Sequence, residues 1–129
     1  MRIADTSALY ALFSQNDVHH EEAMNEVKNP DTILVPSEIW SETIALIHYR
    51  QGFDMAVRAG KALLDLPHVD LLCSRMDSVH YSWDMYQKKG DLSFPDCIVL
   101  GWCKDKGAPP LTFDKTMRKY FEESLKNTS

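Results

Sequence analysis

Residues 2–13 read RIADTSALYALF, and two hydrophobic periodicities follow one another within this stretch. A short apolar run ends at Asp5, and from Ala8 to Phe13 the apolar residues recur at helical spacing. The pattern predicts a strand over residues 2–4, a turn at Asp5 and a helix after the turn. The chain therefore places a carboxylate directly behind a buried strand.

The same alternation of strand and helix continues along the chain. Residues 32–35 are an apolar, partly β-branched run, and residues 69–73 and 110–113 are further strand candidates. Helical patterns are predicted over residues 19–28, 37–50, 53–66, 75–89, 97–106 and 117–125. Strands separated by helices form a parallel sheet with helices on both faces. The sequence thus predicts a three-layer α/β/α sandwich with a central parallel sheet of four strands.

The length and composition fit one compact domain. A chain of 129 residues, of which 44% are hydrophobic, can bury a single core, so residues 1–129 are predicted to form one domain. The net charge of -5 has the wrong sign for a protein that coats nucleic acid by charge alone. Any such contact must be local. It could come from cations bound over an acidic pocket, or from the basic clusters Lys88–Lys89, Lys104/Lys106 and Lys115/Arg118/Lys119, although such clusters are usually solvated helix surface.

The N-terminus and the cysteines bear on the cellular compartment. No apolar run long enough for a signal peptide or a membrane span precedes Asp5, which predicts a cytoplasmic protein without a membrane partner. Cys73, Cys97 and Cys103 are odd in number and form no C-x-x-C pair. This pattern favours reduced, mostly buried thiols over disulfides or a zinc site.

Four carboxylates fall where such a sheet binds its ligands. Asp5 and Asp114 follow predicted strands, Glu42 lies one turn into the helix after the second strand, and Asp96 opens the helix that leads to the fourth. Ligands of open α/β sheets bind at the carboxyl ends of the strands, and the order 3-2-1-4 would make the first and fourth strands neighbours. Four converging carboxylates repel one another unless cations intervene. All-oxygen ligation selects Mg²⁺ or Mn²⁺, ions that promote phosphoryl chemistry.

Each acid also has a purely structural interpretation. Asp5 and Asp114 have good helix N-cap positions, and Ser93 with Asp96 has the spacing of a capping box. Glu42 fits a cap less well, because it lies at the edge of an apolar helical stripe. Glu38, one turn earlier, is predicted to be the more exposed glutamate and a candidate for an outer shell.

Taken together, four motifs in this order and spacing resemble the PIN domain, and within that superfamily the VapC toxins of toxin–antitoxin pairs. The motifs are IADTSAL at 3–9, VPSEIWSE at 35–42, LSFPD at 92–96 and LTFDK at 111–115. The resemblance implies an endoribonuclease dependent on Mg²⁺ or Mn²⁺. It assigns metal ligation to Asp5, Glu42, Asp96 and Asp114, and supporting hydrogen bonds to the hydroxyl groups of Thr6, Ser93 and Thr112.

The resemblance also implies a homodimer, and a cognate antitoxin that inserts a peptide into the active-site groove. Many relatives have a fifth strand after the fourth acid, whereas residues 117–125 here have a helical pattern, so a fifth strand is left open. Thr116 stands two residues after Asp114, where a further acid would support a two-metal site.

Two alternatives to the toxin function remain. The same scaffold could serve as a non-catalytic binding module whose acids only cap helices, or as a housekeeping RNA-processing nuclease. A separate ambiguity concerns the helical stripe Phe53, Val57, Gly60 and Leu64, which is either core or an interface for a partner helix.

Overall fold

The computed structural model describes residues 1–127 and has a parallel four-stranded sheet at its centre. The strands are β1 (Arg2–Ala4), β2 (Ile33–Pro36), β3 (Val69–Leu72) and β4 (Pro110–Leu111). The helices are α1 (Thr6–Phe13), α2 (His20–Lys28), α3 (Ser37–Gln51), α4 (Phe53–Asp65), α5 (Met76–Lys88), α6 (Phe94–Lys106) and α7 (Lys115–Asn127). The strand order β3-β2-β1-β4 is the one that brings the first and fourth strands together.

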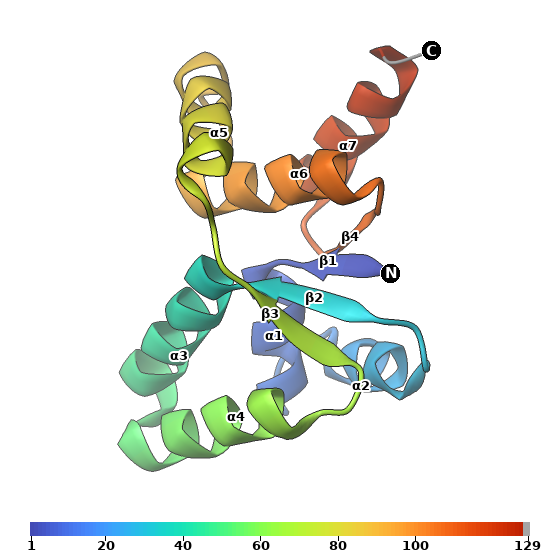
Figure 1. The fold of residues 1–129 in the computed structure, drawn as a ribbon. Helices are drawn as coiled ribbons and strands as arrows, with labels where there is room; N and C mark the ends of the chain where they lie inside the picture. The colour runs from blue at the N-terminus through green and yellow to red at the C-terminus, as the bar shows by residue number, and fades with distance from the viewer. Residues whose placement is uncertain (128–129) are drawn as a thin grey trace.

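Helices cover both faces of the sheet, which confirms the predicted α/β/α sandwich. In Figure 1, α1, α2, α3 and α4 lie below the sheet, and α5, α6 and α7 lie above it. The central strands β1 and β2 are largely buried, with Ile3 and Val35 fully buried, whereas Asp70 and Leu71 of the edge strand β3 are exposed. Within residues 1–127, no helix is both long and apolar enough to cross a bilayer.

The ends of the central strands lie side by side because β1 pairs with β2 on one side and with β4 on the other. Ile3 is in register with Leu34 of β2 and with Pro110 of β4. Since all three strands run in the same direction, their carboxyl ends meet at one edge of the sheet. The residues that follow β1, β2 and β4 are therefore brought together.

The fourth strand is shorter than predicted, and the last segment is a helix. The pairing of β4 ends at Leu111, because two of the following N–H groups bond to side chains: that of Phe113 to Ser7 Oγ, and that of Asp114 to Thr112 Oγ1. The chain then enters α7, so the described residues contain no fifth strand.

The helical stripe on α4 is not core in the isolated chain. Phe53, Val57 and Leu64 are 65%, 39% and 55% exposed, and only Gly60 of the four is buried, under the side chain of Ile44. The buried face is formed instead by Ala56, Ala59, Gly60 and Leu63. Of the two interpretations of the stripe, burial in the core is therefore wrong, because Ala56, Ala59 and Leu63 face the protein in place of its large residues.

The cysteines behave as predicted. All three are free thiols; Cys97 and Cys103 are buried, and Cys73 is exposed. Burial raises the pKa of Cys97 to about 11 and that of Cys103 to about 12, so both thiols stay protonated at neutral pH.

Candidate active site

Asp5 is a buried carboxylate at the point where β1 becomes α1. Its Oδ1 caps α1 by accepting from the N–H of Ala8 at 3.0 Å, and it also accepts from Ser7 Oγ at 2.7 Å. Its Oδ2 accepts from the hydroxyl of Thr112, in the turn after β4. Burial raises the pKa of Asp5 above its ordinary value of 3.8, and these hydrogen bonds only partly offset the rise.

Glu42 lies on α3, the helix that follows β2 at the same edge of the sheet. It is exposed, lies one turn into α3 and accepts a hydrogen bond from the hydroxyl of Thr6, the first residue of α1. Thr6 thereby ties Glu42 to the segment that carries Asp5. Glu38 is less exposed than Glu42, contrary to the prediction, because the hydroxyl groups of Ser37 and Ser74 both donate to its carboxylate.

Asp96 stands at the start of α6. The N–H of Asp96 donates to Ser93 Oγ at 3.2 Å, and the N–H of Ser93 donates to Asp96 Oδ2 at 3.3 Å, so the predicted capping box is formed. Partial burial raises the pKa of Asp96, bonds to Ser93 lower it, and the charges of Asp114 and Glu42 raise it further. This mutual repulsion indicates that the acids of α3, α6 and α7 share one region.

Asp114 is exposed and opens α7. Its Oδ1 accepts from the N–H groups of Thr116 at 2.8 Å and Met117 at 3.2 Å, and its own N–H donates to Thr112 Oγ1 at 3.0 Å. The predicted capping roles of Asp5, Asp96 and Asp114 are thus all confirmed. A cap uses only some of the lone pairs of a carboxylate, so capping and metal ligation do not exclude one another.

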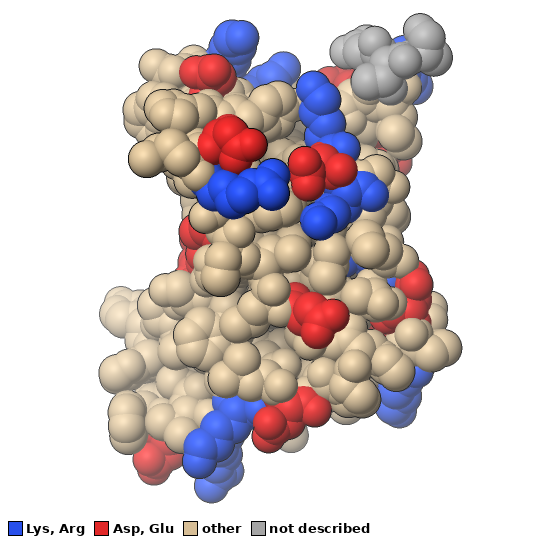
Figure 2. All heavy atoms as spheres, viewed as in Figure 1, with Lys and Arg blue, Asp and Glu red and all other residues tan. Residues whose placement is uncertain are grey.

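The four acids form no ion pair in the described part of the chain. None of Asp5, Glu42, Asp96 or Asp114 forms a salt bridge with any Lys, Arg or His among residues 1–127. Burial is the main cause of the raised pKa of Asp5, and the charge of Asp96 adds to it. Burial likewise raises the pKa of Asp96, and the charges of Asp114 and Glu42 add to that rise, so the four acids interact electrostatically. Figure 2 shows acidic atoms at a hollow on the left edge of the molecule, where the helices above and below the sheet separate.

The acids are not gathered as a preformed metal cage. Among residues 1–127, no group of three or more His, Cys, Asp or Glu side chains is arranged to hold a metal ion. The carboxylates do not converge because each of them accepts hydrogen bonds from helix N–H groups or hydroxyl groups. The donor set nevertheless fits a hard divalent cation, because it consists of oxygen atoms whose mutual repulsion such an ion would relieve.

The supporting hydroxyl groups fall into two classes. Thr6 and Thr112 donate directly to site carboxylates, whereas the hydroxyl of Ser93 caps the backbone of Asp96. Ser7 was missed in the sequence, although it donates to Asp5 and accepts from the N–H of Phe113 at 3.0 Å. Its place two residues after a capping Asp is a local signal, but the bond to Phe113 depends on strand order.

Comparison with known proteins agrees with this architecture. The PIN domain family model matches residues 2–122. Among solved structures, the chain is similar to VapC20 of Mycobacterium tuberculosis, a toxin that cleaves the sarcin–ricin loop, with 22% identity and a TM-score of 0.84 over 93% of this chain and 95% of that one.

A toxin–antitoxin complex from Klebsiella pneumoniae is also similar, with 18% identity and a TM-score of 0.66, over 88% of this chain and 87% of the matched one. No curated protein sequence matches the chain. Because the family model spans nearly the whole sequence, the protein belongs to the PIN domain family.

Proposed function

We propose that the protein is an endoribonuclease that depends on Mg²⁺ or Mn²⁺, bound through Asp5, Glu42, Asp96 and Asp114. The observation that carries this proposal is the group of four acids at the carboxyl edge of the sheet, none of which forms an ion pair within residues 1–127. Folded proteins rarely retain such a group unless it has a function, because unpaired like charges destabilise the fold.

When bound, the cation supplies a polarised phosphate, an activated water molecule and stabilisation of the leaving oxygen. The protein's own residues fix the ligands. Ser7, Ala8 and Thr112 hold Asp5 from three sides, and the hydroxyl of Thr6 orients Glu42. The α6 and α7 backbones hold Asp96 and Asp114.

The helix ends contribute to anion binding. α1, α6 and α7 all begin at site residues, so the positive ends of their dipoles lie beside the region where an RNA phosphate would bind. They also lessen the repulsion among the carboxylates. The site can therefore accept both the acids and an anionic substrate once a cation is present.

We further propose that this nuclease is the cytoplasmic toxin of a toxin–antitoxin pair, that it forms a homodimer and that a cognate antitoxin binds it. The support is its similarity to VapC20 and to the toxin–antitoxin complex. A housekeeping RNA-processing nuclease would have the same site. A small open reading frame directly upstream, encoding a DNA-binding fold with a tail, favours the toxin.

A non-catalytic binding module is the second candidate. It is favoured by the complete capping roles of Asp5, Asp96 and Asp114 and by the lack of a preformed cage in the described residues. A calorimetric Mn²⁺ titration separates the two, since the proposed nuclease binds the ion in the wild type and loses binding in Asp96→Asn. A module that only caps its helices binds Mn²⁺ in neither protein.

The activity itself is tested by incubating the full chain with a broad panel of RNAs in Mg²⁺ or Mn²⁺. We expect cleavage that stops on addition of chelator and is absent from Asp96→Asn. An intact panel in both metals contradicts the nuclease function.

A further inference from the structure

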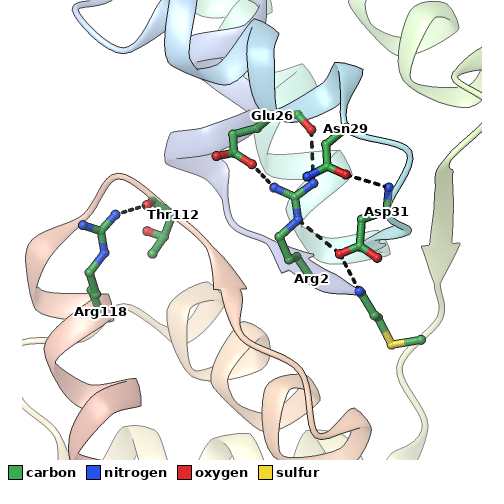
Figure 3. Close-up of polar contacts among 7 residues, drawn as sticks. Arg2, Glu26, Asn29, Asp31, Thr112 and Arg118 are labelled. Carbon is green, nitrogen blue, oxygen red and sulfur yellow. Dashed lines mark hydrogen bonds and ion pairs between the residues drawn. The ribbon is translucent and has the colours of Figure 1, made fainter.

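Arg118 is an arginine that the fold positions without neutralising its charge. Its Nη2 donates to the carbonyl oxygen of Thr112 at 2.8 Å, as Figure 3 shows, and the residue is exposed. No carboxylate among residues 1–127 forms a salt bridge with it. The bond to Thr112 uses one of the five N–H donors of a guanidinium group, which leaves the others available.

Three other arginines of the chain have charged or aromatic partners, whereas Arg58, exposed on α4, has no ion pair among residues 1–127. Arg2 is bound by Glu26 and Asp31 (Figure 3), and Arg75 pairs with Asp77 at 3.3 Å. Arg50 lies over the ring of Tyr10, at 5.1 Å from its centre. Arg118 instead anchors to a neutral carbonyl, so its charge remains available to a ligand.

The anchor places this charge on the segment that holds Asp5 and Asp114. Thr112, whose carbonyl holds the guanidinium group, is also the residue whose hydroxyl donates to Asp5. Arg118 follows Asp114 by one helical turn on the same face of α7, a spacing at which Asp and Arg commonly pair. They do not pair here, since Asp114 caps the backbone of α7. A cation that pairs with no carboxylate among residues 1–127 thus lies one helical turn from Asp114.

We propose that Arg118 binds an RNA phosphate adjacent to the one that is cleaved. This inference rests on the proposed nuclease function. A metal held by the acids would bind the scissile phosphate, and a neighbouring phosphate is the anion that such an arrangement leaves to be recognised. The planar guanidinium fork matches phosphate geometry. With a net charge of -5, the protein cannot attract RNA by its overall field, so a local cation is required.

The test measures binding of a mixed-sequence single-stranded RNA to the full chain in an Asp96→Asn background, over a range of salt concentrations. Arg118→Gln removes the charge and keeps an amide that can donate to the Thr112 carbonyl. We expect about tenfold weaker binding, and a salt dependence whose logarithmic slope shrinks by about 0.7, the value for one phosphate contact on a single strand. Arg118→Lys should keep the slope and lose only part of the affinity. The thermal midpoint should not change.

Lys119→Gln is the matched control, because it removes the same charge from the neighbouring exposed position of α7. It should leave the affinity and slope nearly unchanged. Equal losses in both variants would reduce Arg118 to general surface charge and overturn the proposal. So would an unchanged slope in Arg118→Gln, or a lower thermal midpoint without a change in slope, which would give Arg118 a purely structural role. If the wild type fails to cleave RNA and the Asp96→Asn protein fails to bind it, the nuclease function itself is refuted. If the wild type cleaves RNA but the salt slope is unchanged in Arg118→Gln, only the role of Arg118 is refuted.

Discussion

The two ends of strand β1 differ in whether their charged groups form ion pairs. At the amino end, Arg2 contacts Glu26 and Asp31, and the ammonium group of Met1 lies 2.7 Å from Asp31, so each charge meets its opposite (Figure 3). At the carboxyl end, three residues further on, Asp5 is 1% exposed and receives only neutral donors.

This difference gives a criterion for distinguishing charged groups that stabilise the fold from charged groups that serve a function. Ion pairs at the amino end satisfy the fold by themselves. The carboxyl end keeps repelling charges that the fold holds with hydroxyl and N–H groups but does not neutralise, which is typical of a site that awaits a cation and a substrate.

The largest difference between the two ends should appear in the rate of RNA cleavage when one acid at each end is neutralised. Asp5→Asn keeps an oxygen that can accept from the N–H of Ala8, and its NH2 group can donate to Thr112 Oγ1, but Asn is a poor ligand for a hard cation. We expect RNA cleavage in Mn²⁺ to fall by about 10²–10³-fold, the scale of losing one preorganised electrostatic contact. Asp31→Asn, at the amino end, should change the cleavage rate by less than about twofold. A comparison of kcat/KM measures both, and near-normal cleavage by Asp5→Asn would remove the functional distinction between the ends.

A smaller effect concerns the hydroxyl that links the site strands. Thr112→Val removes the donor to Asp5 and the acceptor for the N–H of Asp114, so the buried carboxylate of Asp5 and the N–H of Asp114 each lose a partner. Urea unfolding should show a loss of about 1–3 kcal/mol, and cleavage should weaken. Thr43→Val is the matched control, because Thr43 is equally buried but donates only to the helical carbonyl of Ile39. Equal losses of stability and activity in both variants would contradict the special role of Thr112.

The smallest effect is a difference in pH dependence between the two ends. The raised pKa values of Asp5 and Asp96 add stability that is fully present below their ordinary value of 3.8 and is lost as the pH rises through the raised values. Asp31 behaves oppositely. Its pKa is lowered by the N-terminal ammonium group, so its stabilisation is present above 3.8 and is lost as the pH falls through the lowered value.

Thermal melts in chelator across acidic pH measure this contrast. The advantage of Asp96→Asn over wild type should shrink as the pH is lowered through the raised pKa of Asp96. The deficit of Asp31→Asn should shrink only at lower pH, below 3.8. Parallel pH profiles for the two variants would show that the ends do not differ in this way.

Much of this arrangement follows from local patterns. The run before Asp5, the buried strand at 32–35 and the helix spacing predict the sheet and place four acids at its carboxyl edge, because strand direction fixes which residues meet. The caps are local as well, so Ser93 and Asp96 show them in the sequence. The metal-ligand role of the acids stays a prediction.

The features that were missed depend on contacts between distant segments. Glu38 is covered because Ser74, 36 residues away, donates to it. β4 ends early because Ser7 captures the N–H of Phe113. The apolar residues of α4 face outward because Ala56 and Ala59 allow that helix to pack closely on α3, a choice that periodicity alone does not decide.

The most direct test of the central claim, that the acids form a cation site and are not only caps, is the thermal stability of wild type and Asp96→Asn in chelator and in Mn²⁺. In chelator, Asp96→Asn should be the more stable protein, because it loses a repelling charge and keeps the shape of the side chain. Saturating Mn²⁺ at a hundredfold excess over its dissociation constant should stabilise wild type by about 2.7 kcal/mol and leave the variant unchanged. If Asp96 only caps α6, the variant loses a charge favourable to the helix dipole and is less stable by about 0.3–1 kcal/mol. A less stable variant in chelator, with neither protein responding to Mn²⁺, would contradict the account.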